Sequence, residues 1–142
     1  MREEEQPILI YWDASAVLSA LIKDKHSQEA HRWVQRSGFH FLSTLSYSEV
    51  LAVLFRIQRE GLMPEVLLDA AEETLERGPW RRLNAVPSWD VLRKLSGKYP
   101  LRGADLWHLA AAKSLQLELP ELRLLTFDQR LRTAARGEKL SL

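Results

Sequence analysis

Hydrophobic residues fall along the chain into short runs of strand length that alternate with segments of helical spacing. A continuous apolar run at residues 8–12 predicts a strand that is buried on both faces. Residues 39–43 and 122–126 predict two further strands, and residues 81–86 predict a weaker one before Pro87. Residues 139–142 are expected to add a terminal strand at one edge of the sheet.

Between these strands, apolar residues recur every three or four positions, which predicts amphipathic helices. Gly38 is expected to end the second helix as its C′ residue. Strands and helices that alternate along a chain favour a central, mainly parallel sheet covered on both faces, a three-layer α/β/α sandwich. The expected helices cover residues 14–23, 27–37, 46–60, 64–77, 88–97 or slightly beyond, 105–119 and 129–136.

Composition limits the possible classes of protein. A chain of 142 residues is expected to form one domain, residues 1–142. The 46% hydrophobic and 27% charged residues are typical of a globular protein. The absence of cysteine excludes disulfides and thiolate metal sites. No apolar run is long enough to span a membrane, and residues 1–6 are acidic where a signal peptide would be basic, so a cytoplasmic location is expected.

The formal net charge is only +1, but the charges are unevenly distributed. Residues 60–76 contain six acidic residues and no Lys or Arg, whereas residues 77–102 contain seven basic residues and one acidic residue. Such polarity could steer a polyanion toward one side of the molecule, although solvated helix faces explain each stretch equally well. The acidic segment 65–76 could instead serve contacts with a second copy or a protein partner.

Four acidic residues stand near the ends of predicted elements. Asp13 follows the first strand, Glu49 lies early in the helix after the second strand, and Asp128 follows the strand that ends at Thr126. Asp105 stands at the start of the preceding helix. In open parallel sheets, sites form outside the carboxyl ends of the strands. The parallel assignment therefore brings all four acids to one edge of the sheet.

Each acid also has a purely structural interpretation. Asp13 and Asp128 could cap helices, Asp105 could favour the positive end of a helix dipole, and Glu49 completes a capping box that begins at Ser46. Together, however, four carboxylates at one edge repel each other, by about 4 kcal/mol for a pair at 4 Å and an effective dielectric near 20. A divalent cation would relieve this repulsion. Oxygen ligands without His or Cys indicate Mg²⁺ or Mn²⁺, a site typical of phosphodiester cleavage.

The motifs around these acids resemble those of the PIN-domain family. The resemblance is carried by residues 11–17 (YWDASAV), 46–49 (SYSE), 101–112 (LRGADLWHLAAA) and 124–128 (LLTFD), and their order and spacing agree with the family over nearly the whole chain. Within the family, the chain is most similar to the VapC-type toxins of toxin–antitoxin pairs. Trp107 and His108 depart from the pattern, because small or polar residues are usual at their positions.

The resemblance implies a ribonuclease that cuts RNA with Mg²⁺ or Mn²⁺, forms a homodimer and is held inactive by a protein antitoxin. Asp13, Glu49 and Asp105 would then be the central catalytic carboxylates and metal ligands, and Asp128 would be the fourth, bound directly or through water. Ser15 and Thr126 would orient these carboxylates through their hydroxyl groups.

Other residues near the acids are candidates for binding RNA. Arg102, Arg130 and Arg132 flank the third and fourth acids and could bind phosphates, although surface solubility explains them equally well. His108 could contact RNA or a metal, but an ordinary packed histidine is the better interpretation. Trp107 could stack on a base, whereas core packing is the better interpretation for Trp12.

Two alternative functions remain open from the sequence. One is a PIN-like RNA-binding or interaction protein with little or no hydrolysis, against which the four intact acids argue. The other, less favoured, is a phosphatase with a phosphoacceptor Asp at position 13. A dehalogenase-type phosphatase would need an Asp two residues later, and Ser15 occupies that position.

Overall fold

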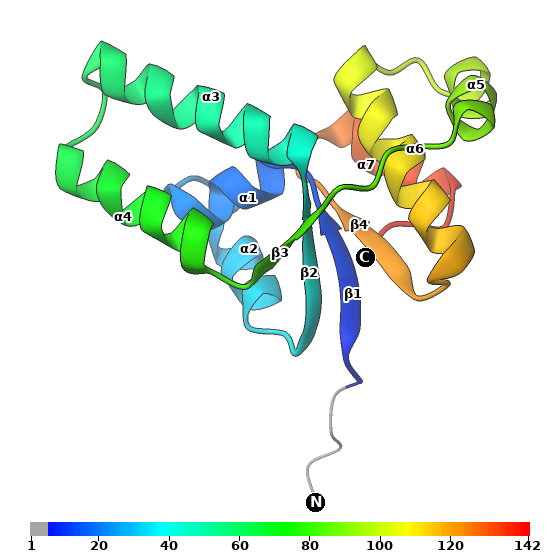
Figure 1. Ribbon diagram of the computed structural model, residues 1–142, viewed down its shortest axis with the longest axis horizontal. Helices are drawn as coiled ribbons and strands as arrows, with labels where there is room; N and C mark the ends of the chain where they lie inside the picture. The colour runs from blue at the N-terminus through cyan, green and yellow to red at the C-terminus, as the bar shows by residue number, and fades with distance from the viewer. Residues whose placement is uncertain (1–5) are drawn as a thin grey trace, which may run out of the picture.

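The computed structural model describes residues 6–142, so the acidic N-terminal residues 1–5 lie outside the described part. Strands and helices alternate as the sequence predicts (Figure 1). The strands are β1 (Ile8–Trp12), β2 (Gly38–Ser43), β3 (Trp80–Leu83) and β4 (Leu122–Leu125). The helices are α1 (Ala14–Leu21), α2 (Ser27–Val34), α3 (Thr44–Glu60), α4 (Glu65–Arg77), α5 (Trp89–Lys98), α6 (Gly103–Glu118) and α7 (Gln129–Gly137).

The four strands form one parallel sheet in the order β3-β2-β1-β4. β1 lies at the centre, with Trp12 opposite Leu42 of β2 and opposite Leu125 of β4. The continuous apolar run of β1 therefore has a direct structural cause, because a central strand of a covered parallel sheet meets side chains on both faces.

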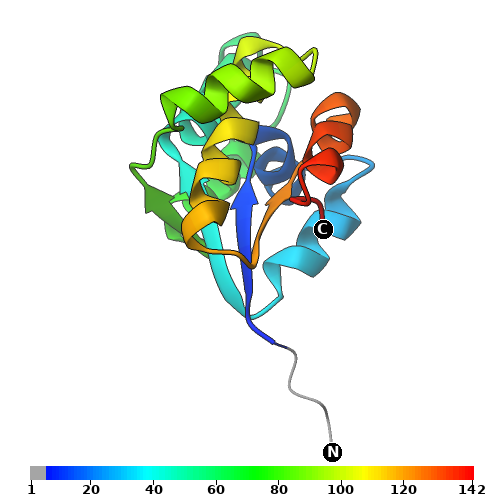
Figure 2. The ribbon, with the colours of Figure 1, turned by 90° about the vertical axis from the view of Figure 1, so that its right-hand side faces the viewer.

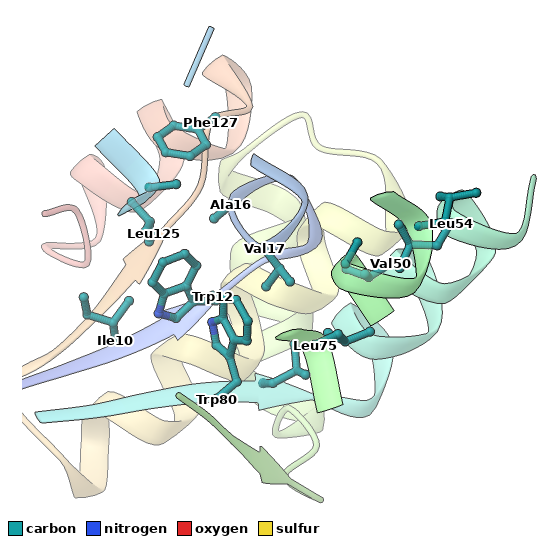
Figure 3. Close-up of a cluster of buried hydrophobic side chains, with 14 residues drawn as sticks. Ile10, Trp12, Ala16, Val17, Val50, Leu54, Leu75, Trp80, Leu125 and Phe127 are labelled. Atoms are coloured by element: carbon teal, nitrogen blue, oxygen red, sulfur yellow. The ribbon is translucent and has the colours of Figure 1, made fainter. Parts of the chain in front are cut away.

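Helices cover both faces of the sheet, which confirms the predicted three-layer α/β/α arrangement (Figure 2). Successive side chains of β1 point to opposite faces, so Trp12 packs with α1–α4 while Tyr11 packs with α5–α7. Trp12 is fully buried, as expected for a core residue. Figure 3 shows its ring beside Trp80, with Val17 and Leu75 completing the core on that face.

Several element boundaries differ from those that the sequence predicts. α2 ends at Val34, and Gly38 is the first residue of β2 rather than a helix C′ residue. Gly38 has a φ of 140°, and a Cβ atom there would collide with the backbone of Ile8, so the close approach of β1 requires glycine. β3 ends at Leu83 because its partner β2 ends at the paired residue Ser43.

The predicted C-terminal edge strand is reduced to a single parallel bridge between Leu124 and Ser141. The Leu124 amide donates to the Leu140 carbonyl at 2.7 Å, which fixes the chain end beside β4. Within residues 6–142, no helix is both long enough and apolar enough to cross a bilayer.

Candidate active site

Asp13 follows the last residue of β1 and caps α1, so strand and helix together fix its position. Its Oδ1 atom accepts hydrogen bonds from Ser15 Oγ at 2.7 Å and from the Ala16 amide at 2.9 Å. Its Oδ2 atom accepts a bond of 2.5 Å from Thr126 Oγ1. The carboxylate is almost completely buried, with a relative exposure of 3%. Ser15 and Thr126, which the resemblance implies would orient the carboxylates, thus both contact Asp13.

Thr126 also connects Asp13 with the fourth acid. Its Oγ1 accepts a hydrogen bond of 3.1 Å from the amide of Asp128, and Ser15 Oγ lies 3.4 Å from the same oxygen. Asp128 caps α7, with Oδ1 accepting from the Leu131 amide at 2.9 Å. Asp13 and Asp128 can therefore cap a helix and belong to the candidate site at the same time. Each carboxylate keeps lone pairs that the helix cap does not use.

Glu49 lies in the second turn of α3, and the predicted capping box with Ser46 does not form. The helix begins at Thr44, and Ser43 is its N-cap, accepting from the Ser46 amide at 3.1 Å. The Glu49 carboxylate contacts His108 instead, with 2.6 Å between Oε1 and Nε2. Because Ser43 is also the last residue of β2, the helix starts earlier than the sequence pattern predicts.

His108 occupies a buried position behind this acid. Its Nδ1 atom lies 2.6 Å from Tyr11 Oη, which in turn donates to Ser43 Oγ at 2.9 Å. Both ring nitrogens of His108 therefore face protein atoms, and neither is directed at the surface for contact with RNA. Burial raises the pKa of Tyr11, more than its hydrogen bonds to Ser43 and Ser46 lower it.

This buried network contains the site residues that sequence reasoning missed. Tyr11, Ser43 and Ser46 join β1, β2 and α3, and Ser46 Oγ closes the network by donating to the Trp12 carbonyl at 2.9 Å. A tyrosine within a strand gives no signal of such a role. His108 is a polar residue inside the apolar, alanine-rich stretch of α6, and this position marks it as unusual. The sequence does not indicate which atoms its ring would contact.

Asp105 and Asp128 face the same surface hollow at the end of the sheet. The hollow has a volume of about 210 Å³. Burial raises the pKa of Asp105, the charges of Asp128 and Glu49 raise it further, and His108 and Arg102 oppose the shift. Asp128 and Glu49 thus lie near enough to Asp105 to act on its charge. The lining residues are Leu101, Arg102, Asp105, Asp128, Gln129 and Arg130.

Burial also raises the pKa of Asp13, against the hydrogen bonds from Thr126, Ser15 and Ala16 that lower it. A negative charge in this position is therefore destabilised by the protein alone. A nearby cation would offset that cost, and the oxygen donors of Asp13, Asp105 and Asp128 fit a hard divalent ion. By their chemistry, the residues present suit Mg²⁺ or Mn²⁺.

The side chains do not converge fully in this arrangement. Among residues 6–142, no group of three or more His, Cys, Asp or Glu side chains lies together closely enough to hold a metal ion. Asp13 is turned toward Thr126 and Ser15, and Glu49 toward His108. The structure thus brings the four acids to one edge of the sheet without gathering three of them around one point.

The three candidate arginines have different surroundings. Arg102 and Arg130 line the acid hollow, and within residues 6–142 neither makes a hydrogen bond or an ion pair through its side chain. Arg132 points elsewhere and lies 3.6 Å from Glu29 of α2. Trp107 is partly buried against the core that α6 forms with β4.

Comparison with known proteins identifies the family of the chain. A PIN domain family model matches residues 10–137. Ribonuclease VapC46 of Mycobacterium tuberculosis is 30% identical over 136 residues, which cover 89% of this chain and 90% of that protein. Ribonucleases VapC45 and VapC49 of the same species are each 32% identical over 131 residues, covering 89% of both chains.

A solved structure shares the fold. The crystal structure of PAE2754 from Pyrobaculum aerophilum superposes with a TM-score of 0.62 over 95% of this chain and 88% of that one, at 16% sequence identity. At that identity, the likeness shows the fold alone. The family model spans most of the chain, and the mycobacterial relatives align with it over nearly their whole length. This protein belongs to the PIN domain family.

Proposed function

We propose that this chain, acting as one domain, is an endoribonuclease that hydrolyses RNA phosphodiester bonds with Mg²⁺ or Mn²⁺. The observation that carries the proposal is the position of Asp13, Glu49, Asp105 and Asp128 at one edge of the sheet. Burial there raises the pKa of Asp105, and the charges of Asp128 and Glu49 raise it further. Relatives that bear the name ribonuclease VapC support RNA as the substrate.

In this proposal the residues have distinct tasks. Asp13, Asp105, Asp128 and Glu49 hold the cation, which when bound polarises the phosphodiester and stabilises the leaving oxygen. Ser15 and Thr126 orient Asp13 through hydrogen bonds of 2.7 and 2.5 Å. Arg102 and Arg130, whose side chains make no hydrogen bond or ion pair among residues 6–142, bind phosphate oxygens of the RNA.

The test is cleavage of fluorescently labelled RNA by the purified protein. Cleavage is expected with Mg²⁺ or Mn²⁺ and not with EDTA, and the Asp13→Asn variant is expected to lose it. The matched control is Asp69→Asn on the exposed surface of α4, which should cleave like the wild type. A chain that cuts no RNA with either metal would refute the proposal.

The incomplete convergence of the acids favours one alternative, an RNA-binding protein with little hydrolysis. RNA binding that persists in EDTA, with no cleavage under any metal, would support this alternative. The phosphoacceptor alternative is weakened, because both oxygens of Asp13 accept hydrogen bonds and the side chain is buried. Phosphate incorporation at Asp13 would restore it.

A toxin role, with a protein antitoxin and a homodimer as partners, is a further part of the proposal. It is supported by the relatives named VapC. Expression of the wild-type chain is expected to arrest growth, and the Asp105→Asn variant should relieve the arrest. A wild-type chain that leaves growth unchanged while it cleaves RNA in vitro would refute the toxin role without affecting the nuclease activity.

A further inference from the structure

A second pocket adjoins the hollow that contains Asp105 and Asp128. It has a volume of about 510 Å³ and lies between the α5–α6 connection and α7. Leu101, Gln129 and Arg130 line both cavities, so the second pocket begins where the acid hollow ends. Its complete lining consists of Tyr99, Pro100, Leu101, Gln129, Arg130, Thr133 and Ala134.

The size and the wall of this pocket suit one nucleoside. Pockets for small ligands measure roughly 300–1,000 Å³, whereas the acid hollow alone is smaller than this range. Pro100, Leu101 and Ala134 provide apolar surface, and Tyr99 adds an aromatic ring of the kind on which RNA-binding proteins stack unpaired bases.

Polar groups with unused hydrogen-bonding capacity lie in the same wall. Among residues 6–142, the side chains of Gln129 and Arg130 have no hydrogen-bond or ion-pair partner. The Gln129 amide can donate and accept at once, as recognition of a base edge requires. Thr133 Oγ1 donates to the Gln129 carbonyl at 2.9 Å and keeps its lone pairs for a ligand.

The aromatic wall is held in place by contacts behind it. Tyr99 Oη donates to Glu138 Oε2 at 2.7 Å, and Lys98 Nζ donates to the same oxygen at 2.7 Å. Gly137 lies against the Tyr99 ring, and a Cβ atom there would collide with the hydroxyl. Because the Tyr99 side chain is already held in one position, less conformational entropy is lost when a ligand binds against it.

We propose that this pocket binds one unstacked base of single-stranded RNA, beside a phosphate held at the acid hollow, and that Gln129 selects which base enters. The proposal rests on the proposed function and names the part of the substrate that this surface recognises. The phosphate and the base of one nucleotide are joined through a single ribose, and the two cavities share Leu101, Gln129 and Arg130 in their walls. The same chemistry would also suit a free nucleotide.

The first experiment measures nucleotide binding to the whole chain in EDTA, so its result does not depend on catalysis. Adenosine, cytidine, guanosine and uridine 5′-monophosphates are titrated separately, and NMR follows the Gln129 side-chain amide and the Thr133 methyl group. Saturable shifts at both groups, with one base preferred, are expected. Shifts confined to other parts of the surface would overturn the proposal.

The variant Thr133→Trp fills the pocket from the exposed side of α7. Nucleotide binding is expected to weaken at least about tenfold, or about 1.4 kcal/mol. Ser96→Trp on α5 is the matched control, because Ser96 is also an exposed helical residue whose hydroxyl donates to a carbonyl of its own helix, and it does not line the pocket. Unchanged affinity of Thr133→Trp would overturn the proposal.

The second experiment separates the two sources of the base. A single-stranded oligonucleotide should bind the metal-free chain more tightly than any monophosphate, and Gln129→Ala should change the base preferred beside the cleavage site. Equal affinity for both ligands would assign the pocket to a free nucleotide and overturn the RNA part.

RNA cleavage without any effect of Thr133→Trp or Gln129→Ala on base preference would refute the pocket and leave the nuclease intact. Nucleotide binding at the pocket without cleavage under any metal would refute the nuclease and leave the pocket as a binding site.

Discussion

His108 Nε2 of α6 lies 2.6 Å from Glu49 Oε1 of α3, and this contact joins two helices on opposite faces of the sheet. The Glu49 side chain is 36% exposed, whereas that of His108 is only 2% exposed. An acid at the rim is thus connected to a buried network that reaches Tyr11 and Ser43 at the ends of neighbouring strands. The contact fixes the direction of Glu49 relative to the other acids.

We expect His108→Ala to weaken Mn²⁺ binding by about 10–100-fold, the usual effect of removing a group that orients a metal ligand. The change also leaves Tyr11 Oη without one of its buried partners, which costs about 1–3 kcal/mol of unfolding free energy. Calorimetric titration with Mn²⁺ and chemical denaturation measure the two effects. The control is His31→Ala, an exposed histidine on α2. Lost stability with unchanged Mn²⁺ affinity would show that His108 does not position Glu49.

Thr126→Val is expected to destabilise the protein and to raise the pKa of Asp13 further. The hydroxyl donates to Asp13 Oδ2 and accepts from the Asp128 amide, so its loss leaves the buried Asp13 carboxylate and the partly buried Asp128 amide with one partner fewer each. The hydrogen bond from Thr126 lowers the pKa of Asp13 against the larger effect of burial. A carboxyl ¹³C NMR titration and denaturation curves check this, with the exposed Thr74→Val as control. A pKa that stays unchanged would contradict the role of Thr126.

Asp13→Asn is expected to stabilise the metal-free protein at neutral pH. Burial raises the pKa of Asp13 in the folded state, so ionisation of Asp13 lowers stability as the pH rises above the unfolded value through the folded one. The neutral amide avoids that cost. Thermal unfolding in EDTA should show a higher Tm for the variant than for the wild type.

The same variant tests the metal site by its response to metal. Mn²⁺ should raise the Tm of the wild type, because a ligand that binds only the folded state stabilises it, and should raise that of Asp13→Asn much less. An equal increase in both proteins would place the metal away from Asp13.

The pH dependence of stability that we expect from Glu138 is opposite to that expected from Asp13. Burial favours its neutral form, but hydrogen bonds from Lys98 and Tyr99 outweigh this and lower its pKa overall. Its contribution to stability is therefore present above the unfolded pKa and is lost as the pH falls through the lowered folded pKa. Glu138→Gln should be less stable than the wild type at pH 7, and the difference should shrink in acid. A difference in unfolding free energy that is constant with pH would contradict this assignment.

The sequence alone determined the layers of the fold, and it supplied the four acids that we propose as the site. Periodicity decides which residues are buried, and the unbroken apolar run of β1 required a central strand in a covered sheet. Because the carboxyl ends of parallel strands share one edge, the sequence pattern alone is enough to place Asp13 near Asp128. The start of α3 was misplaced, because Ser43 and Ser46 are equally good cap residues and only the end of β2 chooses between them.

Tertiary structure alone decided where each of these side chains points. The contact between Glu49 and His108 spans 59 positions in the chain, and that between Asp13 and Thr126 spans 113. Local spacing carries no information about such partners, since they meet only after the sheet has brought α3, α6 and β4 to the same end. The pocket between Tyr99 and Gln129 likewise exists only because α7 packs beside the α5–α6 connection. The side-chain volumes of both segments set the distance between them.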